Sequence, residues 1–152
     1  MAATTAVGVE GVKALAGRHV GYSEWVEITQ EQVNLFADAT GDHQWIHVDP
    51  ERAKSGPFGG PIAHGYLTLS LTPMFLPQIM KIEGFSMGVN YGCDRVRFPS
   101  PVPVGGKLRC GAKVEEVTDV PGGVQVALTL TFEVEGREKP ACVASIIVRH
   151  YL

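Results

Sequence analysis

The sequence predicts an α+β fold in which a curved antiparallel sheet wraps around one long, buried central helix. In residues 124–134, apolar residues alternate with polar or small ones without a break, which is typical of a strand with one buried face. Residues 65–80 contain no charged residue and no histidine, and they are apolar nearly all round a helical wheel. Such a helix must be covered and the apolar face of a sheet must cover something, so the two are expected to pack together.

The remaining elements follow from the same patterns. Residues 85–92 and 107–114 alternate as strands do, and 142–148 are apolar on both faces, as in a central strand. Weaker patterns predict a strand over 22–28 and a short helix over 9–16. Pro73 predicts a kink or an early end in the apolar helix. One helix cannot shield the full edge of such a sheet, so a homodimer is expected.

Composition limits the function. A chain of 152 residues, 45% hydrophobic and 19% charged, indicates one globular domain over 1–152, with residues 1–8 expected to fray. A net charge of −3 without Lys/Arg runs predicts neither nucleic acid nor membrane as a partner. Three widely spaced cysteines without a CxxC pair argue against a disulfide framework or a metal site, and they favour the cytoplasm.

Two helix signals enclose a short irregular segment. Thr29 and Gln32 form a capping-box pattern before one helix, and Gly41 is placed as its C-terminal cap. Asp49 followed by Pro50 then predicts a new helix start. The segment between the two helices is therefore expected to be held in one fixed conformation.

This segment carries a carboxylate, Asp42, and an imidazole, His47, five residues apart. A water molecule held between such groups can be deprotonated by one while the other moves a proton, which serves addition of water to a polarised double bond or the reverse elimination. The alternative is structural, with Asp42 capping a turn and His47 packed in a loop. The ordered combination of a helix end, Asp42, His47 and a new helix start favours a catalytic role for the two residues.

His64 and Gly65 open the apolar helix. A helix N-terminus offers free N–H groups and a partial positive charge, and glycine lets a ligand approach the backbone closely. The Gly65 N–H is therefore a candidate to hold a thioester carbonyl and to stabilise the enolate formed from it. The alternative, equally supported by this feature alone, is that Gly65 only permits tight helix–sheet packing and that His64 is structural.

Three ordered motifs resemble the MaoC-like dehydratases, or (R)-specific enoyl-CoA hydratases, of the hotdog-fold superfamily. The family pattern Gly-Asp-x-Asn-Pro-x-His, followed by Asp-Pro, corresponds to residues 41–50, and Pro-Ile-x-His-Gly corresponds to residues 61–65. Phe-x-x-Pro-Val-x-x-Gly corresponds to residues 98–105. The resemblance covers roughly residues 20–150 and is strongest to short actinobacterial 3-hydroxyacyl-thioester dehydratases, some of them labelled NodN-like.

The resemblance implies a homodimeric single hotdog that reversibly hydrates trans-2-enoyl thioesters to (R)-3-hydroxyacyl thioesters. Asp42 and His47 would be the catalytic pair, and Gly65, with His64 and Gln44, would bind the substrate or its oxyanion. No metal or redox cofactor is implied, because CoA or acyl carrier protein enters as part of the substrate. The chain departs from the family pattern at one point, where Gln44-Trp45 stands in place of the usual Asn-Pro. The role that the family's Asn has is therefore not assigned to Gln44 with the same force.

Two other functions compete with the hydratase. Many hotdog thioesterases carry an Asp or Glu on the central helix, and residues 65–80 contain neither. A non-catalytic acyl-thioester binding protein need not keep a matched acid–base pair. The hydratase therefore requires that the Asp42 and His47 side chains converge within about one water's reach, beside the Gly65 N–H.

Overall fold

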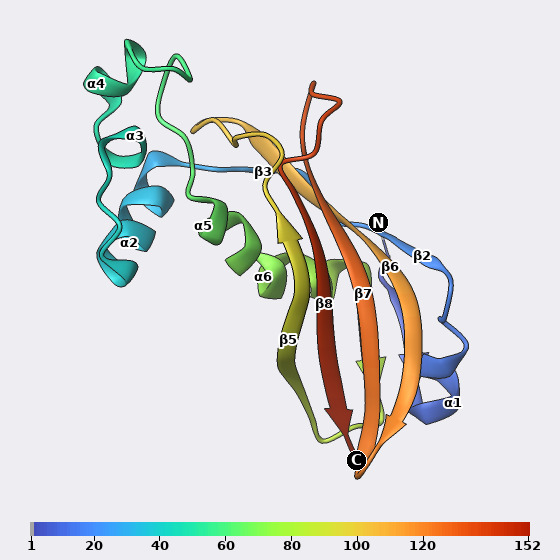
Figure 1. Cartoon of the computed structure of the whole chain (residues 1–152). Helices are drawn as coiled ribbons and strands as arrows, with labels where there is room; N and C mark the ends of the chain where they lie inside the picture. Colours follow the sequence, from blue (N-terminus) through green and yellow to red (C-terminus); the bar gives the residue numbers. More distant parts are fainter. Residues whose placement is uncertain (1) are drawn as a thin grey trace.

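The computed structural model describes residues 2–152 and has a six-stranded antiparallel sheet as its main layer (Figure 1). The strands run in the order β2-β6-β7-β8-β5, with the short β3 also paired to β6. They are β2 (His19–Tyr22), β3 (Val26–Glu27), β5 (Met87–Arg97), β6 (Lys107–Val120), β7 (Gly123–Val134) and β8 (Cys142–Tyr151). The α+β class and the antiparallel sheet are confirmed, and β8 is internal, as its apolar sequence predicted.

The alternation of β7 decides which face of the sheet is buried. Every second residue from Val124 to Val134 is buried, and the residues between are half-buried on the other face. In the register, Leu130 of β7 lies between Ala112 of β6 and Ala144 of β8, so the buried residues of three strands form one continuous apolar face. This face is the wall against which the helices pack.

The expected long central helix is instead two short helices, α5 (Gly65–Ser70) and α6 (Thr72–Ile79). The prediction of one long helix was therefore wrong, whereas the interruption predicted from Pro73 is present. Proline has no N–H to donate to the carbonyl of Leu69, four residues back. The Thr72 hydroxyl donates to that carbonyl at 2.7 Å, so the break leaves it with a partner.

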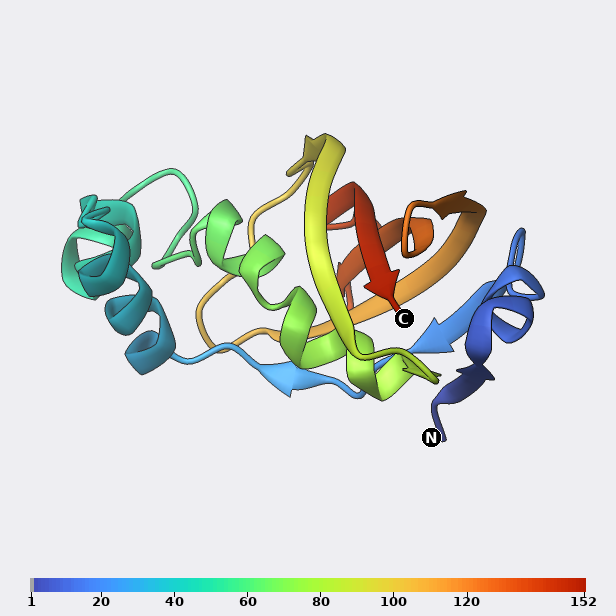
Figure 2. The same ribbon diagram turned by 90° about the horizontal axis from the view of Figure 1, so that it is seen from below.

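Only one side of α5 and α6 is covered by the sheet (Figure 2). Leu67, Phe75 and Ile79 are buried, and the Phe75 ring meets the edge of Phe132 of β7 at 6.1 Å between ring centroids. Tyr66, by contrast, is 70% exposed. The expectation of burial nearly all round does not hold for the single chain, because β5 and the helices leave an open groove between them.

Three helices, α2 (Gln30–Thr40), α3 (Trp45–Val48) and α4 (Pro50–Lys54), form a group beyond one end of the sheet (Figures 1 and 2). The predicted capping box of α2 is confirmed, and Gly41 takes the left-handed conformation that ends the helix, with φ of 83°. The Asp49 side chain caps α4 as predicted. The single turn α3 was not predicted.

The N-terminal segment forms a second, two-stranded sheet. β1 (Thr4–Val7) pairs in parallel with β4 (Met80–Glu83), which follows α6, and α1 (Gly8–Lys13) comes directly after β1. Residues 4–7, within the segment expected to fray, form a strand, and residue 1 lies outside the described residues. The helix predicted over 9–16 is present as the shorter α1, and the strand predicted over 22–28 is divided between β2 and β3. Across residues 2–152, no helix has the length and apolarity needed to cross a membrane.

Replacing Thr29 by Ala should weaken the start of α2. The Thr29 hydroxyl accepts the N–H of Gln32, and the loss of such a cap costs about 1 kcal/mol of unfolding free energy. Urea denaturation measures this loss. The exposed Thr5→Ala serves as the control, and an equal effect of the two substitutions would contradict the capping role.

Candidate active site

The three motifs are joined by backbone hydrogen bonds across the base of the site. The Ile62 N–H donates to the carbonyl of Ile46 in α3 at 2.9 Å, which ties the first motif to the second. The Ala63 N–H donates to the carbonyl of Val102 at 2.8 Å, which ties the second motif to the third. Segments far apart in sequence therefore meet in one fixed arrangement.

His47 is held by one hydrogen bond on its ring and by another that its backbone receives from the Gln30 side chain. Its ring Nδ1 donates to the Ile62 carbonyl at 2.7 Å, which fixes the neutral tautomer with the lone pair on Nε2. Its own carbonyl accepts from the Gln30 side-chain amide at 2.8 Å. The residue is 6% exposed, and Nε2 is the nitrogen left to accept a proton.

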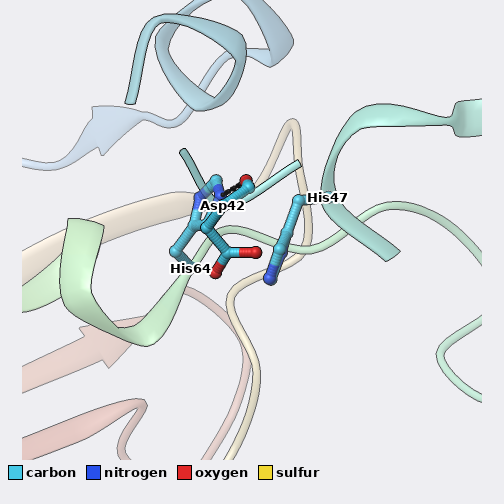
Figure 3. Close-up of side chains that lie close together, drawn as sticks. All are labelled: Asp42, His47 and His64. Atoms are coloured by element: carbon cyan, nitrogen blue, oxygen red, sulfur yellow. Dashed lines mark hydrogen bonds between the residues drawn. The ribbon is translucent and has the colours of Figure 1, made fainter. Parts of the chain in front are cut away.

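Asp42 follows directly after the Gly41 cap, so its position is set by the end of α2. Its Oδ1 accepts the backbone N–H of Gln44 at 3.3 Å, an Asx turn that orients the carboxylate. Figure 3 shows this carboxylate pointing into the space between the rings of His47 and His64. Asp42 is exposed and His47 is buried, so the pair is open to solvent at its carboxylate.

His64 contacts both members of this pair. Its Nε2 donates to the backbone carbonyl of Asp42 at 3.0 Å, and its ring stacks on that of His47 with 3.9 Å between centroids. The residue is 2% exposed, and its buried Nδ1 has no hydrogen-bond partner among residues 2–152. The structure therefore places His64 against Asp42 and His47, where it positions both.

The three groups suit a bound water. One oxygen of Asp42 and a ring nitrogen of each of His47 and His64 lie within 4.8 Å of one another. Two hydrogen bonds of about 2.8 Å through one water span such a distance. The same three groups are of the types that can ligate a metal ion, and on each imidazole one ring nitrogen is already engaged by a backbone carbonyl, which leaves one nitrogen per ring.

Burial sets the protonation of His47. Desolvation lowers the pKa of its imidazole from the ordinary value of 6.5, and the neighbouring His64 lowers it further. The hydrogen bond to Ile62 and the charge of Asp42 act in the opposite direction and are weaker in sum. His47 is therefore neutral at physiological pH, as a general base must be.

Gly65 lies beside the pair, as the first residue of α5. It shares with His47 the lining of a cavity of about 330 Å³, which also includes Phe98. A Cβ on Gly65 would lie 3.0 Å from the Phe98 ring, so glycine is required here for space. The N–H groups of the first turn of α5 have no partner within the helix, and this end adjoins the cavity.

The structure brings together four of the five predicted site residues: Asp42, His47, His64 and Gly65. Gln44 contributes its backbone N–H, and its side chain is exposed. The sequence reasoning missed Gln30 and the Ile62 carbonyl as supports for His47. Gln30 lies 17 residues before His47 within a capping sequence, so no local signal pointed to the contact.

Comparisons with known proteins show the family to which the chain belongs. Residues 12–135 match the model of the MaoC like domain. The chain is 56% identical to 3-hydroxyacyl-thioester dehydratase Z of Mycobacterium tuberculosis (strain ATCC 25618 / H37Rv) over 93% of this chain and 95% of that protein. It is 43% identical to Nodulation protein N of Rhizobium meliloti (strain 1021), over 93% and 89% of the two chains.

A solved structure supports the fold. The (R)-hydratase from A. caviae involved in PHA biosynthesis superposes with a TM-score of 0.70 at 22% identity, covering 86% of this chain and 95% of that one. Both the family match and the 56% identity extend over most of the chain and include all three motifs. The chain therefore belongs to the MaoC-like dehydratase family and has the hotdog fold.

Proposed function

We propose that this protein is a hydro-lyase that reversibly hydrates trans-2-enoyl thioesters to (R)-3-hydroxyacyl thioesters. The observation that carries the proposal is the convergence of Asp42 and His47 within 4.8 Å, with Gly65 on the wall of the same cavity as His47. The 56% identity to a 3-hydroxyacyl-thioester dehydratase supports the same reaction class.

In the hydration direction, a water bound between the pair adds across the C2=C3 bond. Nε2 of His47 accepts one proton of the water while its oxygen bonds to C3, and the Asp42 carboxylate orients the water by accepting its other hydrogen. The π electrons move toward the thioester carbonyl and give an enolate. The imidazolium of His47 then returns its proton to C2, so one water is consumed and the enzyme is regenerated.

The enolate oxygen is assigned to the N-terminus of α5. The Gly65 N–H faces the developing negative charge in this proposal, and the helix end adds a partial positive charge. The absence of a Cβ at Gly65 lets Phe98 pack close against this point, where its ring narrows the cavity. Exclusion of water there strengthens the hydrogen bond to the oxyanion.

Room for the acyl chain supports the same proposal. Beyond the His47 cavity, a space of about 410 Å³ lies between the α5–α6 junction and β5, and one of about 600 Å³ adjoins it along α6. Their walls include Leu69, Pro73 and Leu76.

No redox cofactor or metal enters the proposed step, and the thioester carrier is CoA or acyl carrier protein. The three free cysteines fit a reducing cytoplasm.

The proposal includes a homodimer formed through β5. This strand is the edge of the sheet, and ten of its eleven residues are exposed in the single chain, with Met87 and Tyr91 more than half exposed. A long, exposed edge strand is a template for pairing with another strand, and the exposed Met87, Val89 and Tyr91 make the first half of this edge apolar. A second copy placing its own β5 there would cover this edge and close the groove beside α6.

Asp42→Asn and His47→Gln should each abolish most of the hydration of crotonyl-CoA. His47→Gln removes the base that accepts the proton, and Asp42→Asn removes the charge and one acceptor oxygen of the carboxylate that orients the water. We expect turnover to fall roughly a hundredfold or more in each variant. Loss of the enoyl-thioester absorbance measures the reaction.

Asp38→Asn and His43→Gln are the matched controls, because these residues form a surface ion pair at 2.9 Å close to the site. Turnover that survives in the Asp42 and His47 variants would contradict the assigned roles. Release of free CoA thiol would indicate a thioesterase, and tight binding without chemistry would indicate a binding protein.

The pH profile of kcat/KM should report on His47. The base must be neutral, so activity rises with pH as the imidazole loses its proton. Because burial lowers the pKa of His47 below 6.5, the rising limb should lie below pH 6.5, with a plateau at neutral pH. Initial rates measured in buffers of constant ionic strength test the position of this limb. The measurements should run from about pH 4.5 to 8, roughly the range over which an imidazole titrates. A limb centred above 6.5 would exclude His47 as the buried base.

The native mass should be twice the chain mass of 16.3 kDa in sedimentation equilibrium. The double variant Met87→Asp/Tyr91→Asp places charges along the exposed edge and should give a monomer. Leu35→Asp, at a residue of α2 that is 62% exposed, is the control and should stay dimeric. A wild-type monomer at micromolar concentration would refute the interface.

A further inference from the structure

We propose that Trp45 is a positioning residue, whose indole ring holds α3 and, through it, the His47 ring. The inference rests on the proposed role of His47 as the base. It concerns the point at which this chain departs from the family motif, where Gln44-Trp45 stands in place of Asn-Pro.

Helix α3 needs support from outside itself. It has only the four residues from Trp45 to Val48, and Gln44 before it makes no side-chain cap. A single helical turn is unstable alone, because nucleation costs more than one or two hydrogen bonds return. The bonds from Ile62 and Gln30 hold Ile46 and His47, and they leave the first residue of the turn to be held by other contacts.

The Trp45 ring supplies such contacts on two sides. The Arg52 guanidinium of α4 lies over it, 4.4 Å from the ring centroid. A Cβ on Gly56, in the loop after α4, would lie 2.9 and 3.0 Å from two atoms of the same ring, so the ring abuts the Gly56 backbone directly. The indole is thus clamped between α4 and the following loop, and it fixes α3 relative to both.

Gly56 is required for space rather than for its backbone conformation. Its φ is outside the left-handed range, in contrast to Gly59, which has φ of 73° in the same loop. Alanine is therefore compatible with the backbone at Gly56, and its methyl group would act chiefly on the Trp45 ring. The Ala53 carbonyl, 3.3 Å from the added Cβ, is the other close atom.

The packing of Trp45 replaces a restraint that proline would give through the backbone. Trp45 is the first residue of α3, where proline is favoured because its fixed φ suits a helix and its missing N–H has no intrahelical partner. Gln44 has φ of −59° and ψ of 141°, which a residue before proline can adopt. This chain lacks the rigid backbone and has a clamped side chain instead.

Gly56→Ala tests the clamp without touching the site. Displacement of the indole should shift α3 and lower kcat for crotonyl-CoA about tenfold or more, with KM nearly unchanged, because small misplacements of a base affect chemistry most. Gly60→Ala is the matched control, since its Cβ would meet nothing within 4 Å and its φ is also outside the left-handed range. An equal effect of the two changes would overturn the proposal.

Trp45→Pro and Trp45→Ala separate positioning from general stability. Proline restores the backbone restraint and should retain most of kcat, whereas alanine should lose it. In the Trp45→Pro background, Gly56→Ala should have no further effect, because there is no indole to displace. A full effect of Gly56→Ala in that background, or normal kcat in Trp45→Ala, would contradict the clamp.

An independent readout separates this inference from the proposed function. The imidazole ¹⁵N shifts of His47 report its tautomer whether or not the enzyme turns over. Wild type should show protonated Nδ1, and Trp45→Ala should show a mixture of tautomers as the bond to Ile62 loosens. An unchanged tautomer would overturn the positioning role, whereas inactive wild type with the predicted shifts would refute only the hydratase.

Discussion

The site depends on the hydrogen bond from Nδ1 of His47 to the carbonyl of Ile62. It fixes the tautomer, so that Nε2 faces the space shared with Asp42. It also pairs with the bond in the opposite direction, from the Ile62 N–H to the Ile46 carbonyl. Two short segments that are not stable alone, the turn α3 and the strand-like stretch before α5, therefore stabilise each other.

This pair of bonds is connected to the sheet. The stretch around Ile62 bonds onward to Val102, and Gly105 at the end of the third motif donates to the carbonyl of Ile28 at 2.7 Å. Ile28 is buried and lies just before α2, the helix whose end places Asp42. The two members of the proposed catalytic pair are thus set by one connected network, and Asp42 receives a second restraint from His64 through its carbonyl.

Features with local signals could be predicted from the sequence. The caps of α2 and α4 are such features, because Thr29, Gly41 and Asp49 bond to or end the helix beside them. The alternation of β7 likewise revealed the buried face of the sheet. Contacts over long distances in the chain could not be predicted: β1 pairs with β4 some seventy-six residues later, and Gln30 reaches His47 across 17 residues.

The central helix shows how two local signals can conflict. The apolar composition of residues 65–80 predicted one long buried helix, and Pro73 predicted a break. The break is present, because a missing N–H cannot be compensated by hydrophobicity, and the Thr72 hydroxyl satisfies the carbonyl left free. The exposed side of α5 and α6 faces the groove beside β5, which is where we propose that the acyl chain and a second copy lie.

The stereochemistry of hydration in D₂O tests the central claim most directly. If His47 both takes the proton from water and returns it to C2, the hydroxyl and the deuterium must add to the same face of the double bond. Proton NMR of the product from crotonyl-CoA should then show a single C2-deuterated diastereomer of syn addition, with the (R) configuration at C3. Label on the opposite face, or an (S) product, would contradict the single-base mechanism built on His47 and Asp42.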